Sequence, residues 1–578
     1  MDKKSIAAML EEIGTLLEMK GESAFRSLAY TKAARSLLAV PGDMEEIIRS
    51  TDLKGIRGIG ESIRQKILEI YETGHCAYYE EIRKSLPPGI IRMLRVPGLG
   101  PKKAKILYER LGISSINELQ YACNENRLIS LPGFGAKTQT KLIESIAFLQ
   151  KHADRYLYSF AASEAQKVFA PLKKSNKTIR IAIGGSIRRK KEIIRDIDIV
   201  ASSDKPAEVM ELFVELPAVE SITASGDTKT SVTLTSGIAV DLRVVTDEQF
   251  PYALQYFTGN QDHNVRLRGI ARKKGLKLNE YGLFRIQDNS LVKCREEADI
   301  YRELGLEYVP PELREDMGEV EAALDGTLPE LLEESDIVGL FHVHTRYSDG
   351  RDEVLEIAQA AKGHGYKYVG ITDHSQIAAY AGGMKVSDLF AQSEEIDRAN
   401  AQISGVHIFK GAEVDILPDG TLDYPDEILK NLDFTICSIH SKFKMTEEEA
   451  TNRIIKAMEN PYFTILGHPT GRLLLGRDGY PVDMKKIIDA AASLGAAIEL
   501  NAHPQRLDID WRELKYAKNR GVKIAIGPDA HNLGGFEDMA YGIGIARKGW
   551  LGKADVLNAM TKEEISEFFR SRKAKKAA

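Results

Sequence analysis

The chain has 578 residues, a formal net charge of −5, 43% hydrophobic residues and 28% charged residues, which is ordinary for a soluble globular protein of several domains. It has no apolar run of the roughly 18 residues that a membrane helix needs. Acidic residues occur too early for a signal peptide, and the four scattered cysteines form no zinc or disulfide pattern. We therefore expect a cytoplasmic protein with no membrane partner.

Charge and histidine content differ between the two ends of the chain. Residues 1–310 hold 47 Lys and Arg against 40 Asp and Glu, whereas residues 311–578 hold 32 against 44. A basic front suits a polyanion and an acidic back suits metal cations, although ordinary variation between domains would give the same difference. Nine of the twelve histidines follow residue 340. Because histidine is the commonest metal ligand, this concentration indicates a metal centre in the C-terminal part.

A short glycine pattern occurs three times near the N-terminus, as "IRGIGESIRQKI" (56–67), "VPGLGPKKAKIL" (96–107) and "LPGFGAKTQTKL" (131–142). Glycine permits a tight turn, and the helix predicted after each turn offers free amides to a phosphate. One copy would suit many helical linkers, but three indicate helix-hairpin-helix motifs that hold a DNA backbone without reading its bases. The predicted DNA contacts are Gly58, Gly60, Gly98, Gly100, Lys102, Lys103, Gly133 and Gly135, with further charge from Lys105, Lys137 and Lys141.

Two apolar strands predicted in the middle of the chain carry carboxylates. Asp196 and Asp198 lie two residues apart in "RDIDIV", so they face the same side of a strand, and Asp241 lies in "IAVDLRVV". Charged groups in apolar strands are costly unless they are paired or metal-bound. Three converging carboxylates would suit two Mg²⁺ ions. The alternative is that Asp196 and Asp198 face solvent from a half-exposed strand.

The motifs around these aspartates resemble the palm and thumb of family X DNA polymerases, the group of DNA polymerase beta. "GGSIRR" (184–189) matches the triphosphate-binding motif, "DIDIV" the paired metal ligands and "YFTGN" (256–260) the sugar-facing segment, with Asn260 where the family has serine. The resemblance implies that Asp196, Asp198 and Asp241 bind two Mg²⁺ ions and catalyse nucleotidyl transfer from dNTPs to a DNA primer. It implies substrate contacts at Gly185, Ser186, Arg189, Tyr256, Phe257, Gly259, Asn264 and Arg268.

The same resemblance suggests a second chemistry in the N-terminal helical region. In the eukaryotic repair members a lysine forms a Schiff base with the 5′-deoxyribose phosphate that remains after base excision. Alignment of the first hairpin places Lys66 at that position, with Arg26, Tyr30 and Lys32 near the phosphate pocket. An ordinary surface lysine on a helix is the alternative, because the lowered pKa that such catalysis needs cannot be read from a sequence.

The C-terminal part alternates apolar runs with helical patterns. Seven runs begin near residues 341, 368, 408, 434, 463, 496 and 523, and six of them end in a metal-binding side chain. Parallel strands covered by helices form a barrel economically, and barrel enzymes place their sites at the carboxyl ends of the strands. His342 and His344, two apart in the first run, would face the same side of an extended strand. The predicted ligands are His342, His344, Asp349, His374, Glu413, His440, His468, Asp529 and His531.

This ligand set resembles that of the PHP phosphoesterase domain over about residues 335–570. The resemblance implies three metal positions. The first is held by His342, His344, Glu413 and Asp529, the second by Glu413, His440 and His468, and the third by Asp349, His374 and His531. Imidazole with carboxylate favours Mn²⁺ or Zn²⁺. In bacterial and archaeal family X polymerases this domain is associated with Mn²⁺-dependent 3′→5′ exonuclease and 3′-end phosphoesterase activity. His364, His407 and His503 are expected to be structural.

The sequence thus predicts a multidomain α/β repair polymerase with a second, hydrolytic site. The expected order is a lyase-like helical domain (1–85), fingers with two helix-hairpin-helix motifs (86–152), a palm with a mixed sheet (153–255), a thumb (256–315), a linker (316–336) and a distorted (β/α)7 PHP barrel (337–578). The expected partners are gapped or primed DNA and dNTPs, and we expect a monomer. Two alternatives stay open: a DNA-binding nuclease whose polymerase site is secondary, and a barrel whose metals only stabilise the fold.

Overall fold

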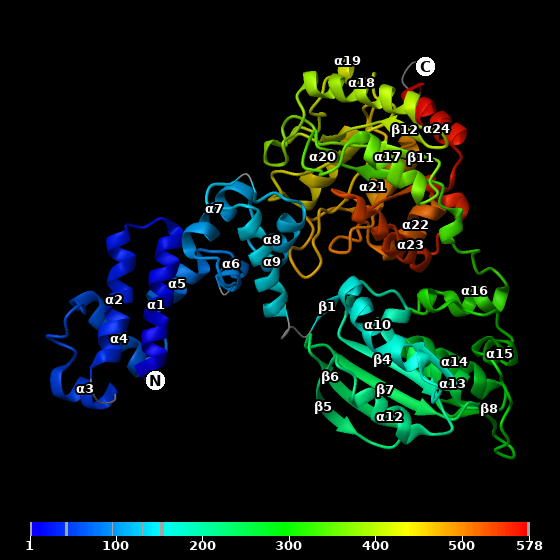
Figure 1. Ribbon diagram of the computed structural model, residues 1–578, viewed down its shortest axis with the longest axis horizontal. Helices are drawn as coiled ribbons and strands as arrows, with labels where there is room; N and C mark the ends of the chain where they lie inside the picture. Colours follow the sequence, from blue (N-terminus) through cyan, green and yellow to red (C-terminus); the bar gives the residue numbers. More distant parts are fainter. Residues whose placement is uncertain (1–2, 41–43, 95, 130, 151–154, 575–578) are drawn as a thin grey trace. The chain divides into compact units, whose positions relative to one another are not determined.

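A computed structural model of the chain describes residues 3–40, 44–94, 96–129, 131–150 and 155–574 (Figure 1). The chain forms two compact units, Met1–Leu149 and Gln150–Ala578. The predicted boundary between fingers and palm, at residues 152 and 153, lies outside the described residues. The expected combination of a helical N-terminal region with later α/β regions is confirmed.

The first unit is helical and has two apolar cores. Its helices are α1 (Lys3–Lys20), α2 (Ala24–Ala39), α3 (Met44–Thr51), α4 (Glu61–Thr73), α5 (Ala77–Lys84), α6 (Pro88–Met93), α7 (Pro101–Leu111), α8 (Ile116–Asn124) and α9 (Ala136–Gln150). One core joins α1 to α5 and includes Leu10 and Ile67. The other joins α6 to α9 and includes Leu107 and Leu142. Each core thus contains its own hairpins.

The palm is a five-stranded mixed sheet in the order β2-β4-β7-β6-β5 (Figure 1). Its elements are β1 (Tyr156–Leu157), α10 (Tyr158–Lys174), β2 (Arg180–Ile183), α11 (Gly185–Arg188), β3 (Ile193–Ile194), β4 (Asp196–Ser202), α12 (Pro206–Val214), β5 (Val219–Ser225), β6 (Lys229–Leu234) and β7 (Ala239–Val245). Strands β4 and β7 are parallel neighbours, with Asp198 directly opposite Asp241. The residues on either side of Asp198 and of Asp241 are buried, so both aspartates, with Asp196, share the other face of the sheet.

The thumb follows as α13 (Phe250–Thr258), α14 (Gln261–Lys273), β8 (Leu276–Asn279), β9 (Gly282–Arg285), α15 (Glu297–Glu303) and η1 (Pro311–Leu313). The segment expected to be a linker contains α16 (Glu319–Asp325) and η2 (Glu334–Asp336). Val320 and Ala323 of α16 pack into the apolar core of the thumb. The acidic composition of this segment gave no sign that α16 has a buried face. The helix α16 packs against the thumb core.

The C-terminal part has all seven predicted strand runs, covered by helices. The strands are β10 (Gly339–Val343), β11 (Tyr368–Ile371), β12 (His407–Lys410), β13 (Glu413–Asp415), β14 (Ile436–Ser438), β15 (Ile465–Leu466), β16 (Ala497–Asn501) and β17 (Ile524–Gly527). The helices are α17 (Val354–Gly363), α18 (Val386–Gln402), α19 (Asp426–Leu429), α20 (Glu447–Met458), α21 (Met484–Leu494), α22 (Trp511–Asn519), α23 (Met539–Lys548) and α24 (Lys562–Ala574), with short 3-10 turns η3 (Ala379–Ala381), η4 (Leu533–Asp538), η5 (Lys553–Asp555) and η6 (Leu557–Ala559). Each of the seven predicted runs contains a strand.

The strand ladder is divided into two parallel sheets, β10-β11-β12 and β13-β14-β15-β16-β17. Strands β12 and β13 are two parts of one predicted run. Isolated parallel bridges connect the sheets on both sides, His374 to Glu413 and Val343 to Ala530. Both bridges involve or adjoin predicted ligands, so the breaks in the ladder coincide with the metal-type side chains.

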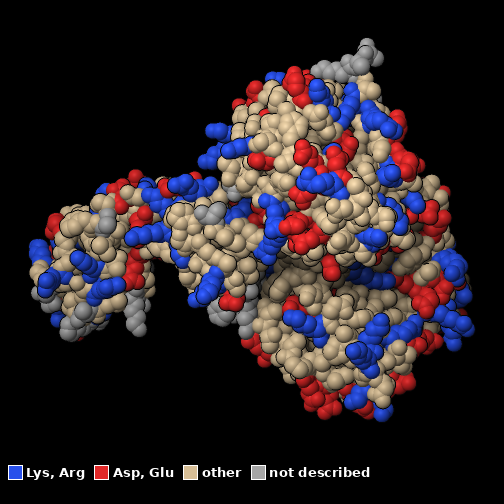
Figure 2. Space-filling view, turned by 45° about the horizontal axis from the view of Figure 1, so that its top comes forward, with Lys and Arg blue, Asp and Glu red and all other residues tan. Residues whose placement is uncertain are grey.

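No helix among the described residues is both long and apolar enough to cross a membrane. Basic and acidic side chains are interspersed over the face seen in Figure 2. The charge difference between the two ends of the sequence therefore does not separate into a basic and an acidic face in that view.

A buried histidine in the thumb predicts a pH-dependent stability. His263 is fully buried between Glu319 (Nδ1–Oε1 2.7 Å) and the Tyr301 hydroxyl (2.9 Å). Burial lowers its pKa, although Glu319 opposes this effect, so the folded state favours neutral imidazole. As pH falls through about 6.5 the unfolded chain takes up the proton first. This contribution to stability is therefore complete above that pH and is lost below it.

We expect His263→Gln to reduce the free energy of unfolding by about 1–3 kcal/mol near pH 8, through loss of buried hydrogen bonds. The deficit relative to wild type should shrink near pH 5.5, about one unit below the unfolded pKa. Thermal unfolding at both pH values measures this difference. Exposed His364, changed to Gln, is the control, and an H263Q deficit that is independent of pH would contradict the assignment.

Candidate active sites

The palm carboxylates lie against a glycine turn. Asp196 and Asp198 lie on β4, and Asp241 lies on the adjacent strand β7. Gly185, at the start of α11, has a φ of +58°, and a Cβ added there would lie 2.1 Å from Asp198 Oδ2. Only glycine therefore allows α11 to approach this carboxylate. The turn from β2 into α11 and the carboxylate strand thus form one close-packed site, as the sequence predicts.

The charges of the palm site suit divalent cations. Burial, reinforced by Asp196 and Asp241, raises the pKa of Asp198 to about 6. Asp241 accepts a hydrogen bond from Ser231 Oγ (2.6 Å) and pairs with Lys229 Nζ (2.6 Å). The three aspartates do not form a group of described residues whose ligand atoms all lie within 4.8 Å. Mg²⁺ prefers carboxylate oxygens as ligands, so the three aspartates fit this ion. Asp241 is paired with Lys229 in this structure.

The predicted triphosphate-binding segment is α11 and the residue after it. Ser186 is half-buried on α11, and Arg189 caps the helix end. The Arg189 guanidinium donates from Nε to Glu315 Oε1 (3.1 Å) and from Nη1 to the Thr258 carbonyl. Its neighbour Arg188 pairs with Glu297 (2.8 Å). The structure therefore holds Arg189 beside the glycine turn, in contact with a carboxylate rather than free.

The predicted sugar-facing residues lie at the junction of α13 and α14. Tyr256 and Phe257 lie in the last turn of α13 with their ring centres 5.1 Å apart. A Cβ added at Gly184 would lie 3.4 Å from the Phe257 carbonyl oxygen. Gly259 has a φ of +68°. Asn260 caps α14 by accepting from His263 N (2.8 Å), which a serine hydroxyl would also do.

On α14, Asn264 donates to the Tyr256 carbonyl (2.8 Å) and accepts from Gln255 (2.7 Å). Arg268 lies one turn further along this helix and is half-buried. The structure thus brings the predicted nucleotide-facing asparagine to the aromatic end of α13.

The three glycine turns of the helical unit have the same geometry. Gly58, Gly98 and Gly133 have φ of +93°, +87° and +81°, and each turn is closed by a backbone bond from the next residue to the residue two before the glycine. The second glycines, Gly60, Gly100 and Gly135, directly precede α4, α7 and α9, with nothing within 4 Å of a Cβ built there. The helix amides beyond them are thus open to an approaching phosphate. Lys102 is exposed, whereas Lys103 lies half-buried over the Phe134 ring (5.6 Å).

Lys66 belongs to an aromatic cluster on the first helical core. Its Nζ lies 4.7 Å from the centre of the Tyr78 ring, and Tyr78 stacks on Tyr30 at 6.2 Å. Arg26 is close enough to interact electrostatically with both tyrosines, whereas Lys32 is exposed one turn along α2. Three of the four residues suggested by the alignment are therefore neighbours.

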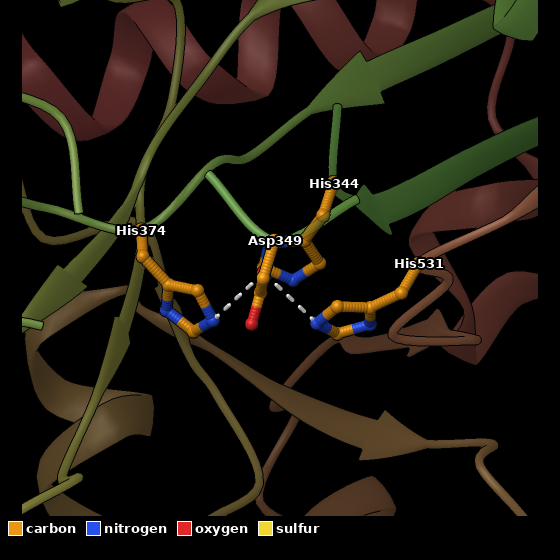
Figure 3. A group of neighbouring side chains, drawn as sticks. All are labelled: His344, Asp349, His374 and His531. Atoms are coloured by element: carbon orange, nitrogen blue, oxygen red, sulfur yellow. Dashed lines mark ion pairs between the residues drawn. The ribbon is translucent and has the colours of Figure 1, made fainter. Parts of the chain in front are cut away.

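All nine predicted ligands of the C-terminal part converge. They fall into four overlapping groups whose ligand atoms lie within 4.8 Å: His344, Asp349, His374 and His531; His342, Glu413 and His468; His342, His344 and Asp529; and His374, Glu413 and His440. Figure 3 shows the first group, with Asp349 between His374 (3.7 Å) and His531 (3.2 Å). Against the expected three sets, His344 joins the Asp349 group and His374 also reaches Glu413.

Glu413 is the centre of this site. It is fully buried, and its Oε1 lies 2.8 Å from His468 Nε2 and 3.1 Å from His440 Nε2. Its Oε2 lies 2.9 Å from His374 Nδ1 and 3.5 Å from His342 Nε2. A carboxylate with imidazoles on both oxygens can bridge two metal ions, as the sequence predicts.

His342 and His344 reach the same place by a different route from the one expected. His342 has a φ of +59°, and the register of β10 shifts between Leu340 and Val343. The strand is therefore not regularly extended at the ligands. Both imidazoles nevertheless approach Asp529 Oδ1, at 3.4 and 3.2 Å. Asp529 also has a left-handed backbone, with a φ of +55°, and such strain is common at functional sites.

Sequence reasoning missed a second set of buried carboxylates behind the ligands. Glu499 on β16 pairs with His342 Nδ1 and accepts from His468 N (2.7 Å). Asp415 faces His440 Nδ1 (3.3 Å). Such carboxylates fix the tautomer and direction of a ligating imidazole. The run containing Glu499 was the one expected to end without a ligand, and a lone acid inside that apolar run was the available signal.

Asp373, next to His374, supports the loop that carries Asp349. It accepts from Thr345 N (2.8 Å) and from the hydroxyls of Thr345 and Ser348. Arg506 places its Nε 3.4 Å from Asp529 Oδ2. These residues were not predicted, because their role depends on loops that come together only in the folded chain.

The buried histidines have opposite preferences for protons. Burial opposes charge on His342, but neighbouring carboxylates, Glu499 first, outweigh it and raise its pKa well above the usual range. Burial likewise opposes charge on His440, but Glu413 and Asp415 raise its pKa to about 10. Burial, helped by Arg506, lowers the pKa of His468 to about 3. The site therefore attracts positive charge, which metal ions can supply.

The three histidines expected to be structural lie outside the four ligand groups. His364 is exposed beside Tyr366 and Phe536, and His407 contacts Phe409. His503 accepts from Gln505 N (3.2 Å) in a turn.

Fold and sites together indicate a nucleotidyltransferase joined to two helix-covered parallel sheets with a candidate metal site, and the comparisons agree. Matching families are a DNA polymerase beta thumb (253–315), a helix-hairpin-helix domain (1–76), a SAM-like helix-hairpin-helix tandem (90–147) and a PHP domain (341–503). The chain is 38% identical over 572 residues to the DNA polymerase/3′-5′ exonuclease PolX of Bacillus subtilis, covering 99% of this chain and 100% of that protein. It therefore belongs to the family X DNA polymerases with a C-terminal PHP domain.

The PHP part also has shorter relatives. Probable phosphatases of Thermoanaerobacter sp. (strain X514) and Caldanaerobacter subterraneus are each 33% identical, over 255 and 211 residues. The alignments cover 40% and 34% of this chain and 95% and 78% of those proteins. The PHP part of this chain is thus similar to most of the length of proteins named probable phosphatases.

The contribution of Glu499 to metal binding can be tested without changing the metal ligands themselves. Two hydrogen-bond donors, His342 Nδ1 and His468 N, converge on Glu499, and a glutamine could accept only one of them well. We expect Glu499→Gln to weaken Mn²⁺ binding on the order of tenfold, measured by titration calorimetry on the metal-stripped protein. The exposed Glu459→Gln is the matched control. An affinity equal to wild type would remove Glu499 from the metal site.

Proposed function

We propose that this enzyme fills short gaps in DNA by template-directed synthesis and trims 3′ ends with its PHP domain. The convergence of nine ligands, seven of them buried and two half-buried, carries the proposal. Together with the palm carboxylates on adjacent strands, they would hold metal ions at two separate places in one chain. The named relative PolX is a polymerase and 3′-5′ exonuclease. The hairpin glycines and lysines would hold the DNA backbone independently of its sequence.

In the palm, Asp196 and Asp198 would hold two Mg²⁺ ions and Asp241 would hold the ion nearer the primer. When bound, these ions supply the charge that stabilises the triphosphate and acidifies the primer hydroxyl. The backbone of Gly185, the Ser186 hydroxyl and the Arg189 guanidinium would orient the phosphates. Tyr256 and Phe257 would form the wall against the incoming sugar, so the contribution of the protein is mainly positioning and electrostatics.

In the PHP domain, the nine ligands would hold two or three Mn²⁺ or Zn²⁺ ions, with Glu413 between two of them. When bound, these ions supply the Lewis-acid chemistry of phosphodiester hydrolysis. Glu499 and Asp415 would keep the ligating nitrogens of His342 and His440 directed at the centre. Arg506, buried beside Asp529, adds a fixed positive charge at the site.

The two activities should be separable by mutation. Asp196→Ala with Asp198→Ala should reduce extension of a primer in a one-nucleotide gap by at least about 10³-fold, because the metal-binding charge is removed. His342→Ala with His344→Ala should reduce Mn²⁺-dependent degradation of the DNA by a similar factor. Each pair should leave the other activity intact, and both are measured on labelled gapped DNA with and without dNTPs.

Several outcomes would contradict this division. Extension that survives the aspartate changes would exclude the palm as the synthetic site. Degradation that survives the histidine changes would exclude the PHP domain as the nuclease. A folded, Mn²⁺-loaded wild type without nuclease activity would favour metals that only stabilise the barrel.

A second activity, removal of 5′-deoxyribose phosphate, is favoured by the arrangement around Lys66. The half-buried Tyr78 ring lies 4.7 Å from the Lys66 ammonium, and the exposed Arg26 beside it would pair with the phosphate of a bound sugar phosphate. The Lys66 amine would attack the open-chain aldehyde of the sugar and form a Schiff base with loss of water. Loss of a C2′ proton would then break the C3′–O bond and release DNA with a 5′-phosphate. Water would hydrolyse the remaining imine and free both Lys66 and the unsaturated sugar phosphate.

Borohydride should trap this Schiff base as a covalent adduct between the wild-type protein and DNA with a 5′-deoxyribose phosphate. We expect Lys66→Ala to reduce trapping about 10²-fold or more, as for loss of a covalent nucleophile. The nearby exposed Lys32→Ala should weaken DNA binding but keep the adduct. Equal trapping by wild type and Lys66→Ala would assign the chemistry to another amine.

A further inference from the structure

A lysine of the PHP domain is buried against the polymerase domain. Lys548 ends α23, its side chain is fully buried, and its Nζ donates to the Arg189 carbonyl (2.8 Å) and to Glu315 Oε1 (2.7 Å). The indole of Trp511 lies over the same ammonium at 4.4 Å. Burial lowers the pKa of Lys548 to about 8, although Glu315 opposes this effect, so the ammonium is charged at neutral pH. A buried charge in this position needs a partner from the polymerase side.

The partner, Glu315, is shared among several cations. Its side chain is 5% exposed, and Arg189 Nε (3.1 Å) and Lys548 Nζ (2.7 Å) meet at the same oxygen. Lys191 Nζ approaches the other oxygen at 3.6 Å, where Asn260 also donates (3.3 Å). Burial opposes charge on Glu315, but the surrounding cations, Lys548 first, lower its pKa. Glu315 is therefore an anion held in place by both domains.

The contact around this cluster is tightly packed. Trp511 Nε1 donates to Glu192 Oε1 (3.0 Å), and the Tyr158 and Tyr541 rings meet edge to face at 5.8 Å. Trp550, two residues beyond Lys548, packs into the apolar core of the thumb. Lys548 thus cannot move away from Glu315 without disturbing both domains.

We propose that Lys548 is a positioning residue for the polymerase reaction: it holds Glu315, so that Arg189 can exchange this carboxylate for the triphosphate of an incoming dNTP. The inference rests on the assignment of Arg189 to the triphosphate made above. It gives the PHP domain a role in nucleotide binding that does not depend on its own metal site.

The physical reason is the cost of an unpaired buried carboxylate. If Arg189 turned toward a triphosphate and Glu315 had no other close partner, the carboxylate would lose most of its counter-charge in a dry environment. Lys548, on the same oxygen and hydrogen-bonded at 2.7 Å, keeps Glu315 paired. Its second bond, to the Arg189 carbonyl, fixes the main chain of the arginine while the side chain is exchanged. Without Lys548, Glu315 would compete with the triphosphate for Arg189.

The full-length protein tests this competition. Lys548→Met keeps the length of the side chain and removes the charge, and it should raise the KM for dNTP about tenfold with kcat changed less than about threefold, as expected when substrate binding alone is weakened. Addition of Glu315→Gln should return KM to near the wild-type value, because the competing carboxylate is gone. Mn²⁺-dependent nuclease activity should be unchanged. Lys518→Met is the matched control, because Lys518 also pairs with a backbone carbonyl and a carboxylate, but within the PHP domain and next to Trp550.

The results separate the inference from the assignment on which it rests. A raised KM for Arg189→Gln with a normal KM for Lys548→Met would overturn the role of Lys548 and leave Arg189 at the triphosphate. A normal KM for Arg189→Gln would overturn both. A KM defect in Lys548→Met that Glu315→Gln fails to relieve, or that Lys518→Met shares, would reduce Lys548 to a structural contact. If Lys548→Met does not fold, Glu315→Gln alone decides, because it should lower the KM for dNTP, and an unchanged or higher KM overturns the inference.

Discussion

The structure depends on the neutralisation of buried carboxylates. Glu413 has no contact with solvent and is surrounded by imidazoles on both of its oxygens. Because a buried charge without partners is strongly destabilising, the strand ends that carry these histidines have to meet around it. The bridge between His374 and Glu413, where one sheet gives way to the next, lies at this point. The metal site and the closure of the strand array are thus one feature.

The sequence predicted much of this arrangement, because the relevant signals are local. The seven strand runs, the glycine turns and the paired aspartates each follow from spacing within a few residues. What the sequence could not predict depends on contacts between distant residues. Glu499 reaches His342 across 157 positions, and no local pattern indicates that pairing. The left-handed backbone of His342 was also hidden, since the alternation of an ordinary strand already placed both histidines on the same side.

The segment after the thumb, residues 316–336, is a second feature that the sequence did not predict. Its acidic composition indicated a linker, but three of the seven residues of α16 are buried. Val320 and Ala323 pack into the thumb core, and Glu319 pairs with His263. A helix of only seven residues gives a weak periodic signal. Its packing becomes evident only when the thumb core is present. Composition therefore describes the exposed face of such a helix better than its buried one.

In both candidate sites, buried ion pairs lie next to the residues proposed to bind metal or substrate. In the PHP site, Glu499 contacts the ligand His342. In the polymerase part, Glu315 pairs with Arg189. Glu315 pairs with Arg189 of the polymerase part and with Lys548 of the PHP domain. Among the described residues, Glu315 is the only carboxylate in an ion pair with Lys548. On the proposal made above, the cation from the neighbouring domain keeps Glu315 paired when Arg189 turns to the triphosphate. That proposal would couple the PHP domain to nucleotide binding through a single buried ion pair.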